Sequence, residues 1–238
     1  MKCIRFEANG NKRIGFIDGD VVRTVYGSLE TFWRITDEVF RLEDVKLLAP
    51  CVPKQIICVG FNYRSHAEEF HAEVPKEPML FSKAAHTIIG DGAAIVYPWQ
   101  SKEVVYEAEL GVVIKKRMRN VKPEDVKDYI LGYTCANDVT ARDLQLDDVQ
   151  CLLSKSFDTF CPLGPWLETD LDPTDLSIKT YLNGELKQNG RTSDMVYNPY
   201  EILSYISESM TLDAGDLVLT GTPMGCGPMV PGDVVTGE

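Results

Sequence analysis

Residues 104–114 read VVYEAELGVVI, an apolar run that carries two glutamates, Glu107 and Glu109. If this run forms a single β-strand, side chains two positions apart project from the same face of its sheet. Two neighbouring glutamates at the edge of a core cannot both stay ionised without a compensating cation. A divalent metal ion bound by oxygen atoms is one such cation. The alternative is that both carboxylates lie on a strand edge that faces solvent.

A third carboxylate follows the next apolar segment. Residues 130–137 are predicted to form a strand, and Asp138 comes directly after it, in front of a polar turn. Mg²⁺ in proteins accepts one or a few carboxylates and keeps water positions that a substrate can take. Asp138 is therefore the candidate third ligand. Lys155, in the segment SKSF, adds a cation from another loop, where an unpaired lysine among apolar residues would be costly.

Strand-like segments dominate the chain from residue 54 onward. Asn183-Gly184, between KTYL and ELKQ, is the strongest hairpin signal, and helical patterns are confined to residues 62–73 and 201–210. Further short strands are predicted at residues 54–60, 78–83 and 217–220. Because strands and helices do not alternate regularly, the pattern favours a β-rich α+β fold over a βαβ array.

The N-terminal part of the chain is predicted to be a separate unit. Residues 1–50 are expected to form a small β-rich domain, and residues 51–238 the main domain. Residues 28–40 are predicted to form a helix with Ser28 as its N-cap. Turn signals separate short alternating segments at residues 3–7, 13–17 and 21–25.

The composition limits the partners of this protein. Its 238 residues include 24 Lys plus Arg and 36 Asp plus Glu, a net charge of −12, which argues against nucleic acid as a partner. No apolar run reaches the roughly 18 residues of a membrane helix, and the N-terminus MKCIRFEANG is too polar for a signal peptide. We therefore expect a cytoplasmic protein that has a small-molecule substrate and no membrane partner. Seven cysteines without CxxC spacing are expected to be reduced and mostly buried, Cys161 among them.

Several polar residues are candidates for acid–base work and for substrate binding. His66 and Glu69 are three residues apart, so on a helix the carboxylate could orient the imidazole; the alternative is a solvated surface pair. An anionic substrate of so acidic a protein needs local cations. Arg142 could supply one, or it could pair with Asp143, Asp147 or Asp148. Lys83 could face the substrate or be solvated, and the Thr222 hydroxyl could bind a carboxylate or serve a structural turn.

The order of seven segments resembles the fumarylacetoacetate hydrolase family. They are VGFNYRSHAEE, EPMLFSK, YEAELGVVI, NDVTARDLQ, SKSFDTFCPLGPW, NGELKQ and LTGTPMGCGP. The resemblance implies a mixed β-sandwich or roll, usually homodimeric, with Mg²⁺ or Mn²⁺, or Ca²⁺ as a further candidate, at Glu107, Glu109 and Asp138. It also implies that His66 and Glu69 activate water, that Lys155 and Gln145 stabilise negative charge, and that Arg142 contacts the substrate.

Two features depart from the family pattern. His86 follows Lys83 and two alanines, where relatives more often have Lys-Pro, which puts the shape of one pocket wall in doubt. The chain also ends at Glu238, where relatives continue through a last strand, so we expect either a shortened sequence or a strand supplied otherwise.

The branch that the chain resembles most implies metal-dependent hydrolysis of a C–C bond in a small 2,4-dioxo acid, an acylpyruvate-like anionic keto acid. The reaction would pass through an enolate whose charge the metal stabilises. The same enolate would serve an isomerase or tautomerase of the 2-hydroxyhepta-2,4-diene-1,7-dioate type, or an oxaloacetate decarboxylase. Outside enzymes, the alternative is a cation- or small-molecule-binding protein on this fold. The His66–Glu69 pair argues against that alternative, because binding alone needs no general base.

Overall fold

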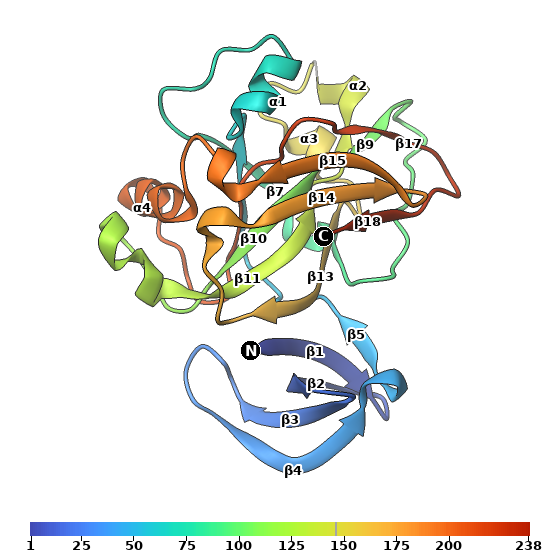
Figure 1. Ribbon diagram of the computed structural model, residues 1–238, viewed down its shortest axis with the longest axis vertical. Helices are drawn as coiled ribbons and strands as arrows, with labels where there is room; N and C mark the ends of the chain where they lie inside the picture. The colour runs from blue at the N-terminus through green and yellow to red at the C-terminus, as the bar shows by residue number, and fades with distance from the viewer. Residues whose placement is uncertain (146) are drawn as a thin grey trace.

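The protein is built mainly of β-strands around one large sheet. The computed structural model describes residues 1–145 and 147–238, and Figure 1 shows a small N-terminal unit below a larger body that carries the helices. The strands of the large sheet are β1 (Lys2–Ala8), β2 (Asn11–Asp18), β3 (Val21–Gly27), β4 (Trp33–Arg41), β5 (Lys46–Leu48), β6 (Ile56–Gly60), β7 (Met79–Lys83), β8 (Ile88–Ile89), β10 (Ala108–Ile114), β11 (Ile130–Asn137), β13 (Cys161–Glu168) and β16 (Leu217–Leu219). Their order is β4-β3-β2-β1-β13-β11-β10-β16-β6-β7, with β5 on β1 and β8 on β13. Because β16 pairs with β6 in parallel while most pairs are antiparallel, the predicted mixed, β-rich α+β fold is confirmed.

Two smaller sheets and a few helices complete the larger body. One sheet has the order β12-β9-β17, with β12 (Thr140–Ala141), β9 (Val104–Tyr106) and β17 (Gly227–Met229); the other has the order β15-β14-β18, with β15 (Glu185–Arg191), β14 (Ser177–Leu182) and β18 (Val235–Gly237). The helices are α1 (Arg64–Glu69), α2 (Arg142–Gln145), α3 (Leu152–Lys155), α4 (Pro199–Ser209) and the 3-10 turns η1 (Leu42–Asp44), η2 (Ala85–Thr87), η3 (Pro123–Tyr129), η4 (Pro173–Asp175) and η5 (Thr192–Asp194). Within the described part of the chain, no helix is long and apolar enough to cross a membrane.

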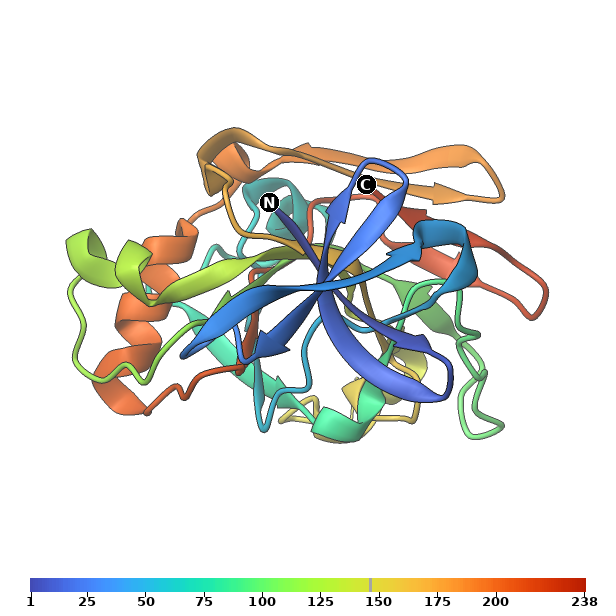
Figure 2. The ribbon, with the colours of Figure 1, turned by 90° about the horizontal axis from the view of Figure 1, so that it is seen from below.

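The N-terminal unit is an antiparallel array that continues the large sheet. Its first strand, β1, pairs with β13 through Lys2 and Cys3, which face Glu168 and Leu167. Figure 2 shows the strongly twisted strands of this unit in front of the larger body. The predicted strands at residues 3–7, 13–17 and 21–25 are confirmed as β1, β2 and β3.

The helix predicted at residues 28–40 is wrong, because these residues make a tight turn followed by strand β4. Ser28 caps no helix; its hydroxyl donates to the Glu30 carboxylate inside the turn. Gly27, at φ 104°, permits this turn, since a Cβ there would collide with the Phe32 carbonyl oxygen. Strand β4 pairs with β3, and the centroids of the Phe40 and Phe6 rings lie 5.7 Å apart. The backbone pairing of β4 with β3 therefore overrides the local helical pattern.

The core of the larger body lies on both faces of the central strand β10, all seven residues of which are buried. On one face, Ile202, Leu203 and Ile206 of α4 join Val112 and Ile114 in a single apolar cluster. Helix α4 begins with a capping box, in which the Asn198 side chain accepts from the N–H of Glu201 and the Glu201 carboxylate accepts from the N–H of Asn198. The helix predicted at residues 201–210 is thus confirmed, and it packs on one face of the strand that carries Glu109.

The predicted hairpin at Asn183-Gly184 is confirmed. Strands β14 and β15 pair across these two residues, whose φ angles of 53° and 81° suit the two-residue turn that Asn-Gly favours. From β15, the buried side chain of Gln188 reaches into the larger body. It accepts from the N–H of Ala108 at 3.0 Å and donates to the Thr222 hydroxyl at 2.8 Å. The small sheet is thereby tied to the strand that bears Glu109.

The single strand predicted at residues 104–114 is wrong in one respect, because the chain changes sheet at Glu107. Residues before it form β9, which pairs with β12 and β17, while residues after it form β10 of the large sheet. At the joint, the N–H of Glu107 donates to the Asn137 side-chain oxygen at 2.9 Å, and its carbonyl accepts from Asp138 at 2.8 Å. These contacts set the carboxylates of Glu107 and Asp138 beside each other.

Candidate active site

Three buried carboxylates meet where β10 and β11 lie side by side. Glu107 precedes β10, Glu109 belongs to it and Asp138 follows β11; their exposed fractions are 4%, 4% and 0%. One carboxylate oxygen from each lies within 4.8 Å of the other two. Neighbouring strands bring these groups together because Ala108 is registered opposite Asn137. The three residues predicted as metal ligands therefore form one cluster.

Three cations contact this carboxylate cluster: Lys155, Arg142 and Lys83. The ammonium of Lys155, which is also buried, lies 2.8 Å from Glu107 Oε2 and 2.6 Å from Asp138 Oδ2. Burial disfavours its charge, but the two carboxylates raise the pKa of Lys155, so it is a cation. The guanidinium of Arg142 pairs with Glu107 Oε1. Although burial by itself raises it, Lys155 and Arg142 together lower the pKa of Glu107 to about 2.

Lys83 and Arg142 take partners that sequence spacing did not reveal. Lys83 is buried, with its ammonium 2.7 Å from Asp138 Oδ1 and 3.0 Å from the Val139 carbonyl oxygen, so the solvated alternative is wrong. Arg142 pairs with Glu107 and with none of its acidic neighbours in sequence. Asp143 instead accepts from Ser101 at 2.6 Å, and Asp148 accepts from the N–H and hydroxyl of Ser154.

The carboxylate cluster fits a hard divalent cation. Burial, together with the nearby charges of Asp138 and Glu107, raises the pKa of Glu109 well above its usual range. Glu109 Oε2 accepts from the N–H of Gly221 at 2.6 Å, but no lysine or arginine of the described chain forms an ion pair with this carboxylate. Asp138 Oδ1 lies beside Lys83 yet accepts no well-aligned hydrogen bond from the described residues. An oxygen-preferring ion such as Mg²⁺ or Mn²⁺ would satisfy both groups.

A competing interpretation is that the cluster is a closed ion-pair network, since Lys83, Lys155 and Arg142 balance three carboxylates. The two interpretations differ in what happens when Lys155 is replaced with Met. If a metal ion competes with Lys155 for oxygens of Glu107 and Asp138, we expect the affinity for Mn²⁺ to rise by at least about tenfold. The physical reason is that the Lys155 ammonium repels a metal ion bound to the same oxygens, and methionine removes this repulsion. Two unit charges about 4 Å apart interact by about 4 kcal/mol at an effective dielectric constant of 20.

Isothermal titration with Mn²⁺ measures this effect of Lys155→Met. The metal-free variant should also melt at a lower temperature, because two buried carboxylates lose a cation, and Mn²⁺ should restore the loss. Lys187→Met is the matched control, since its ammonium pairs with Glu185 on the surface. An unchanged or weaker affinity in Lys155→Met would favour the closed network.

His66 and Glu69 form the second part of the site, on helix α1. Asn62 anchors the start of this segment by donating to the carbonyl oxygens of Thr220 and Tyr197. The helix is shorter than the predicted 62–73, because His71 adopts a positive φ of 52° and lies exposed. His66 is buried, and its Nδ1 lies 3.3 Å from Glu69 Oε2, so the purely solvated alternative does not describe this pair.

The environment of His66 keeps its imidazole neutral. Burial lowers the pKa of His66, and this effect outweighs the carboxylates of Glu107 and Glu69, which raise it. The other oxygen of Glu69, Oε1, accepts from the N–H of Gly225 at 3.0 Å, which fixes the carboxylate. A neutral imidazole held by a fixed carboxylate is suited to accept a proton.

A single cavity of about 650 Å³ joins the two parts of the site. This volume is in the range of small-molecule sites. Aromatic and aliphatic side chains form much of its wall, namely Val59, Phe61, Phe70, Met79 and Phe81. The predicted site residues that line it are His66, Glu107, Glu109, Arg142, Gln145, Lys155 and Thr222. Glu69 and Asp138 stand one contact away, on His66 and Lys155, and Lys83 stands one contact further, on Asp138.

Two of the lining residues are already engaged by protein groups. The Thr222 hydroxyl donates to the Ala108 carbonyl oxygen at 2.8 Å and accepts from Gln188. Its bonds are therefore those of a residue that serves a structural turn, the second of the two roles expected for it. Gln145 accepts from the Arg142 guanidinium, and its amide approaches Cys151 Sγ at 3.5 Å. Gln145 and Arg142 therefore act as one polar unit at the cavity wall.

The sequence reasoning missed Gln188 and Cys226. Gln188 is fully buried and joins Thr222 to Ala108, but nothing in NGELKQ distinguishes it from a surface residue. Cys226 lies half-buried beside the His66–Glu69 pair; its position four residues after Thr222 was the only available signal. All seven cysteines are free thiols, as predicted, and burial raises the pKa of Cys161 to about 12.

Comparison with known proteins finds relatives that cover nearly the whole chain. The profile of the fumarylacetoacetate (FAA) hydrolase C-terminal family matches residues 55–238, and a profile described as Rv2993c-like, N-terminal, matches residues 1–50. An uncharacterized protein of Archaeoglobus fulgidus is 46% identical over 98% of this chain and 90% of its own length.

Two further relatives carry names of enzymes. The oxaloacetate tautomerase fahd2, mitochondrial, of Xenopus laevis is 47% identical over 77% of this chain and 60% of that protein. The crystal structure of 2-hydroxyhepta-2,4-diene-1,7-dioate isomerase from Mycobacterium marinum superposes with a TM-score of 0.92 at 38% identity, covering 100% of this chain and 94% of that one.

Proposed function

This chain belongs to the fumarylacetoacetate hydrolase family, and we propose that it is a metal-dependent tautomerase or isomerase of a small anionic 2-oxo acid. Its reaction would move a proton at the carbon beside the keto group. Enzymes of this family act on keto acids, and the tautomerase and isomerase names of two relatives support proton transfer as the reaction type.

One observation carries the proposal: a buried imidazole and a buried carboxylate cluster line the same cavity. His66 is neutral and oriented by Glu69, while Glu107 and Glu109 stand in the wall of that cavity. Removal of a proton beside a keto group needs a base together with stabilisation of the charge that develops on the keto oxygen. The two halves of the site supply these two requirements.

Each residue then has a distinct task. Glu107, Glu109 and Asp138 would hold a divalent ion, which would supply Lewis-acid stabilisation of negative charge on the substrate. His66 accepts the proton from carbon and returns it to oxygen in a tautomerase, or to another carbon in an isomerase. Glu69 accepts from His66 Nδ1 and stabilises the imidazolium. Arg142 and Lys155 attract the carboxylate of the substrate, and the aromatic walls exclude water from the reacting atoms.

Hydrolysis of an acylpyruvate is the second candidate. Lys155 and Gln145 both face the cavity, where they would stabilise the oxyanion that forms when water adds to a carbonyl. His66 would then deprotonate a water molecule in place of a carbon atom. Cleavage of the C–C bond would release a carboxylic acid and the enol of pyruvate.

A substrate panel separates the two candidates. The purified protein with Mg²⁺ or Mn²⁺ is assayed with enol-oxaloacetate, 2-hydroxyhepta-2,4-diene-1,7-dioate and acetylpyruvate. We expect rapid loss of the enol or dienol absorbance of the first two, at least about tenfold faster than acetylpyruvate cleavage at equal concentrations. Acetylpyruvate cleavage without proton transfer on the other substrates would overturn the first proposal and establish the second. Glu109→Gln controls for catalysis by free metal ion.

A further inference from the structure

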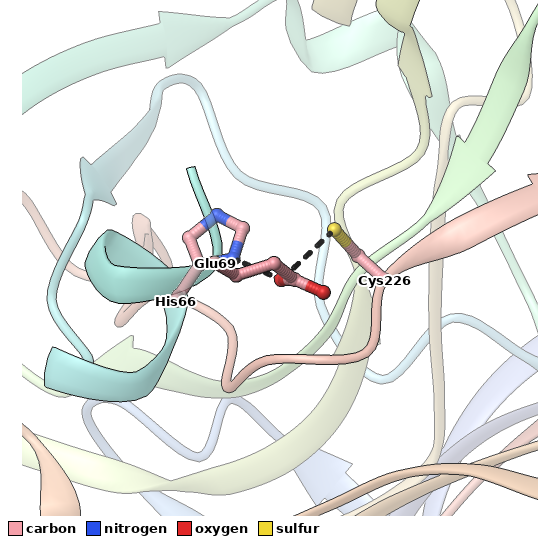
Figure 3. Close-up of side chains that lie close together, drawn as sticks. All are labelled: His66, Glu69 and Cys226. Carbon is pink, nitrogen blue, oxygen red and sulfur yellow. Dashed lines mark hydrogen bonds and ion pairs between the residues drawn. The ribbon is translucent and has the colours of Figure 1, made fainter. Parts of the chain in front are cut away.

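A second group of metal-ligating side chains lies beside the acid–base pair. His66 and Glu69 of α1 and Cys226 of the loop before β17 point toward one another (Figure 3). A ring nitrogen, a carboxylate oxygen and the sulfur all lie within 4.8 Å of one another. Among the described residues, this is the one candidate metal cluster besides the three carboxylates, and it differs from them in containing nitrogen and sulfur donors.

We propose that His66, Glu69 and Cys226 bind a thiophilic divalent ion such as Zn²⁺, and that this ion inhibits the enzyme. The binding site stands on the geometry alone. The inhibition rests on the proposed function, in which His66 is the base.

Two of the three donor–donor distances can be compared with the edges of a tetrahedral site. Typical zinc bonds of about 2.0 Å to nitrogen and oxygen and about 2.3 Å to sulfur give tetrahedral edges of about 3.3 Å for N–O and about 3.5 Å for S–O. In the protein, Glu69 Oε2 lies 3.3 Å from His66 Nδ1 and 3.9 Å from Cys226 Sγ. The first edge therefore matches, and the second needs the thiol to move by a few tenths of an ångström.

The three donors are held in place by the surrounding chain. Glu69 Oε1 accepts from the N–H of Gly225, the residue before Cys226, so the carboxylate and the thiol are fixed to each other. The hydroxyl of Ser65 accepts from the N–H of Met224 at 3.4 Å, which adds a second link between α1 and this loop. His66 is buried, with its ring 4.9 Å from that of Phe70. A preorganised set of three ligands leaves the fourth position for water.

The donor set selects against the ion expected at the carboxylate cluster. Mg²⁺ prefers oxygen ligands, whereas thiolate and imidazole suit Zn²⁺ and Co²⁺. A thiolate and a carboxylate also balance the charge of a divalent ion. Arg142 Nη2 lies 3.7 Å from the sulfur and also pairs with Glu107, so it can donate to a Cys226 thiolate.

Binding changes the protonation of two ligands. Burial raises the pKa of Cys226 to about 12, so the thiol carries its proton until an ion binds and then releases it to solvent. His66 binds through the nitrogen that faces Glu69, in the tautomer that keeps its proton on the other nitrogen. The occupied imidazole has no free lone pair, and it can no longer accept a proton from a substrate.

Co²⁺ is the probe of the site, because a thiolate–Co²⁺ bond has a charge-transfer absorption in the near ultraviolet. We expect this band when Co²⁺ is added to the Mg²⁺-loaded full chain, and its loss in Cys226→Val and Cys226→Ser. Zn²⁺ should inhibit turnover, and both variants should need at least about tenfold more Zn²⁺ for half-inhibition, relative to their own uninhibited rates. The serine variant retains nearly the size of the native side chain and guards against a packing defect in the valine variant.

Cys151→Ser is the matched control, since Cys151 also lies at this cavity but contacts Gln145. It should keep both the absorption band and the sensitivity to Zn²⁺. A band that persists in both Cys226 variants, or that is absent from the native chain, would overturn the site. The band requires no turnover, so failure of the proposed reaction leaves this test intact; normal turnover without the band would contradict the site alone.

Discussion

Glu109→Gln is expected to weaken Mn²⁺ binding by about 100-fold or more and to lower turnover by about 10³-fold. Among the described residues, no cation forms an ion pair with this carboxylate, so its charge is the one that a metal ion would compensate. Two unit charges about 4 Å apart interact by about 4 kcal/mol at an effective dielectric constant of 20, and a divalent ion doubles this. Because every 1.4 kcal/mol is about tenfold, a loss of about 100-fold is a lower bound. Titration calorimetry with Mn²⁺ and steady-state kinetics measure the two effects.

The stability of the metal-free variant separates a lost ligand from a damaged fold. Because burial and the neighbouring carboxylates raise the pKa of Glu109, the folded protein disfavours its ionised form, and stability falls as pH rises through the range in which it ionises. A neutral glutamine should therefore melt at the native temperature or above it without metal, and should lose the rise in melting temperature that Mn²⁺ gives the native chain.

Glu103→Gln is the matched control, since Glu103 lines the same cavity but lies outside the carboxylate cluster. It should keep Mn²⁺ affinity within about twofold, as expected of substitutions away from the binding groups. Native Mn²⁺ affinity in Glu109→Gln would remove Glu109 from the set of ligands. Equal losses in both variants would indicate a general effect of cavity charge.

The three candidate ligand carboxylates could be singled out from the sequence, and the structure brings them together, but the backbone that presents them could not be predicted. Alternation within VVYEAELGVVI suggested that Glu107 and Glu109 share a strand face, whereas the chain passes from β9 to β10 at Glu107. The cause is a long-range one: the side chain of Asn137, thirty residues away in sequence, takes the N–H of Glu107. Such a contact leaves no trace in local periodicity.

The partners of buried charges were the least predictable feature. Arg142 has three acidic residues within six positions, yet it pairs with Glu107, while Asp143 and Asp148 accept from Ser101 and Ser154. The fold decides these pairings by which groups it buries together, since a buried charge must find a partner while a surface charge need not. Sequence therefore identifies the charged residues and leaves their pairing to tertiary structure.

Glu69→Gln is expected to lower turnover by about 10² to 10³-fold while Mn²⁺ affinity stays within about twofold of native. Glu69 orients His66 and stabilises its charged form, but it makes no contact with Glu107, Glu109 or Asp138 among the described interactions. Glutamine retains the size of the side chain and can still accept from Gly225. The loss should therefore fall on kcat, as measured by steady-state kinetics at saturating Mn²⁺.

The pH profile distinguishes a positioning role from a structural one. Burial lowers the pKa of His66, and the carboxylate of Glu69 partly opposes this by raising it. Removing that carboxylate should lower the pKa further, so the acid limb of kcat/KM, where the base becomes protonated, should move to lower pH in Glu69→Gln. His66→Ala should lose the limb altogether, while Glu68→Gln, an exposed neighbour on α1, should keep the native profile. An acid limb that stays in place in Glu69→Gln would mean that Glu69 does not act through His66, whatever the loss in rate, because removing a group that stabilises the imidazolium must shift its titration.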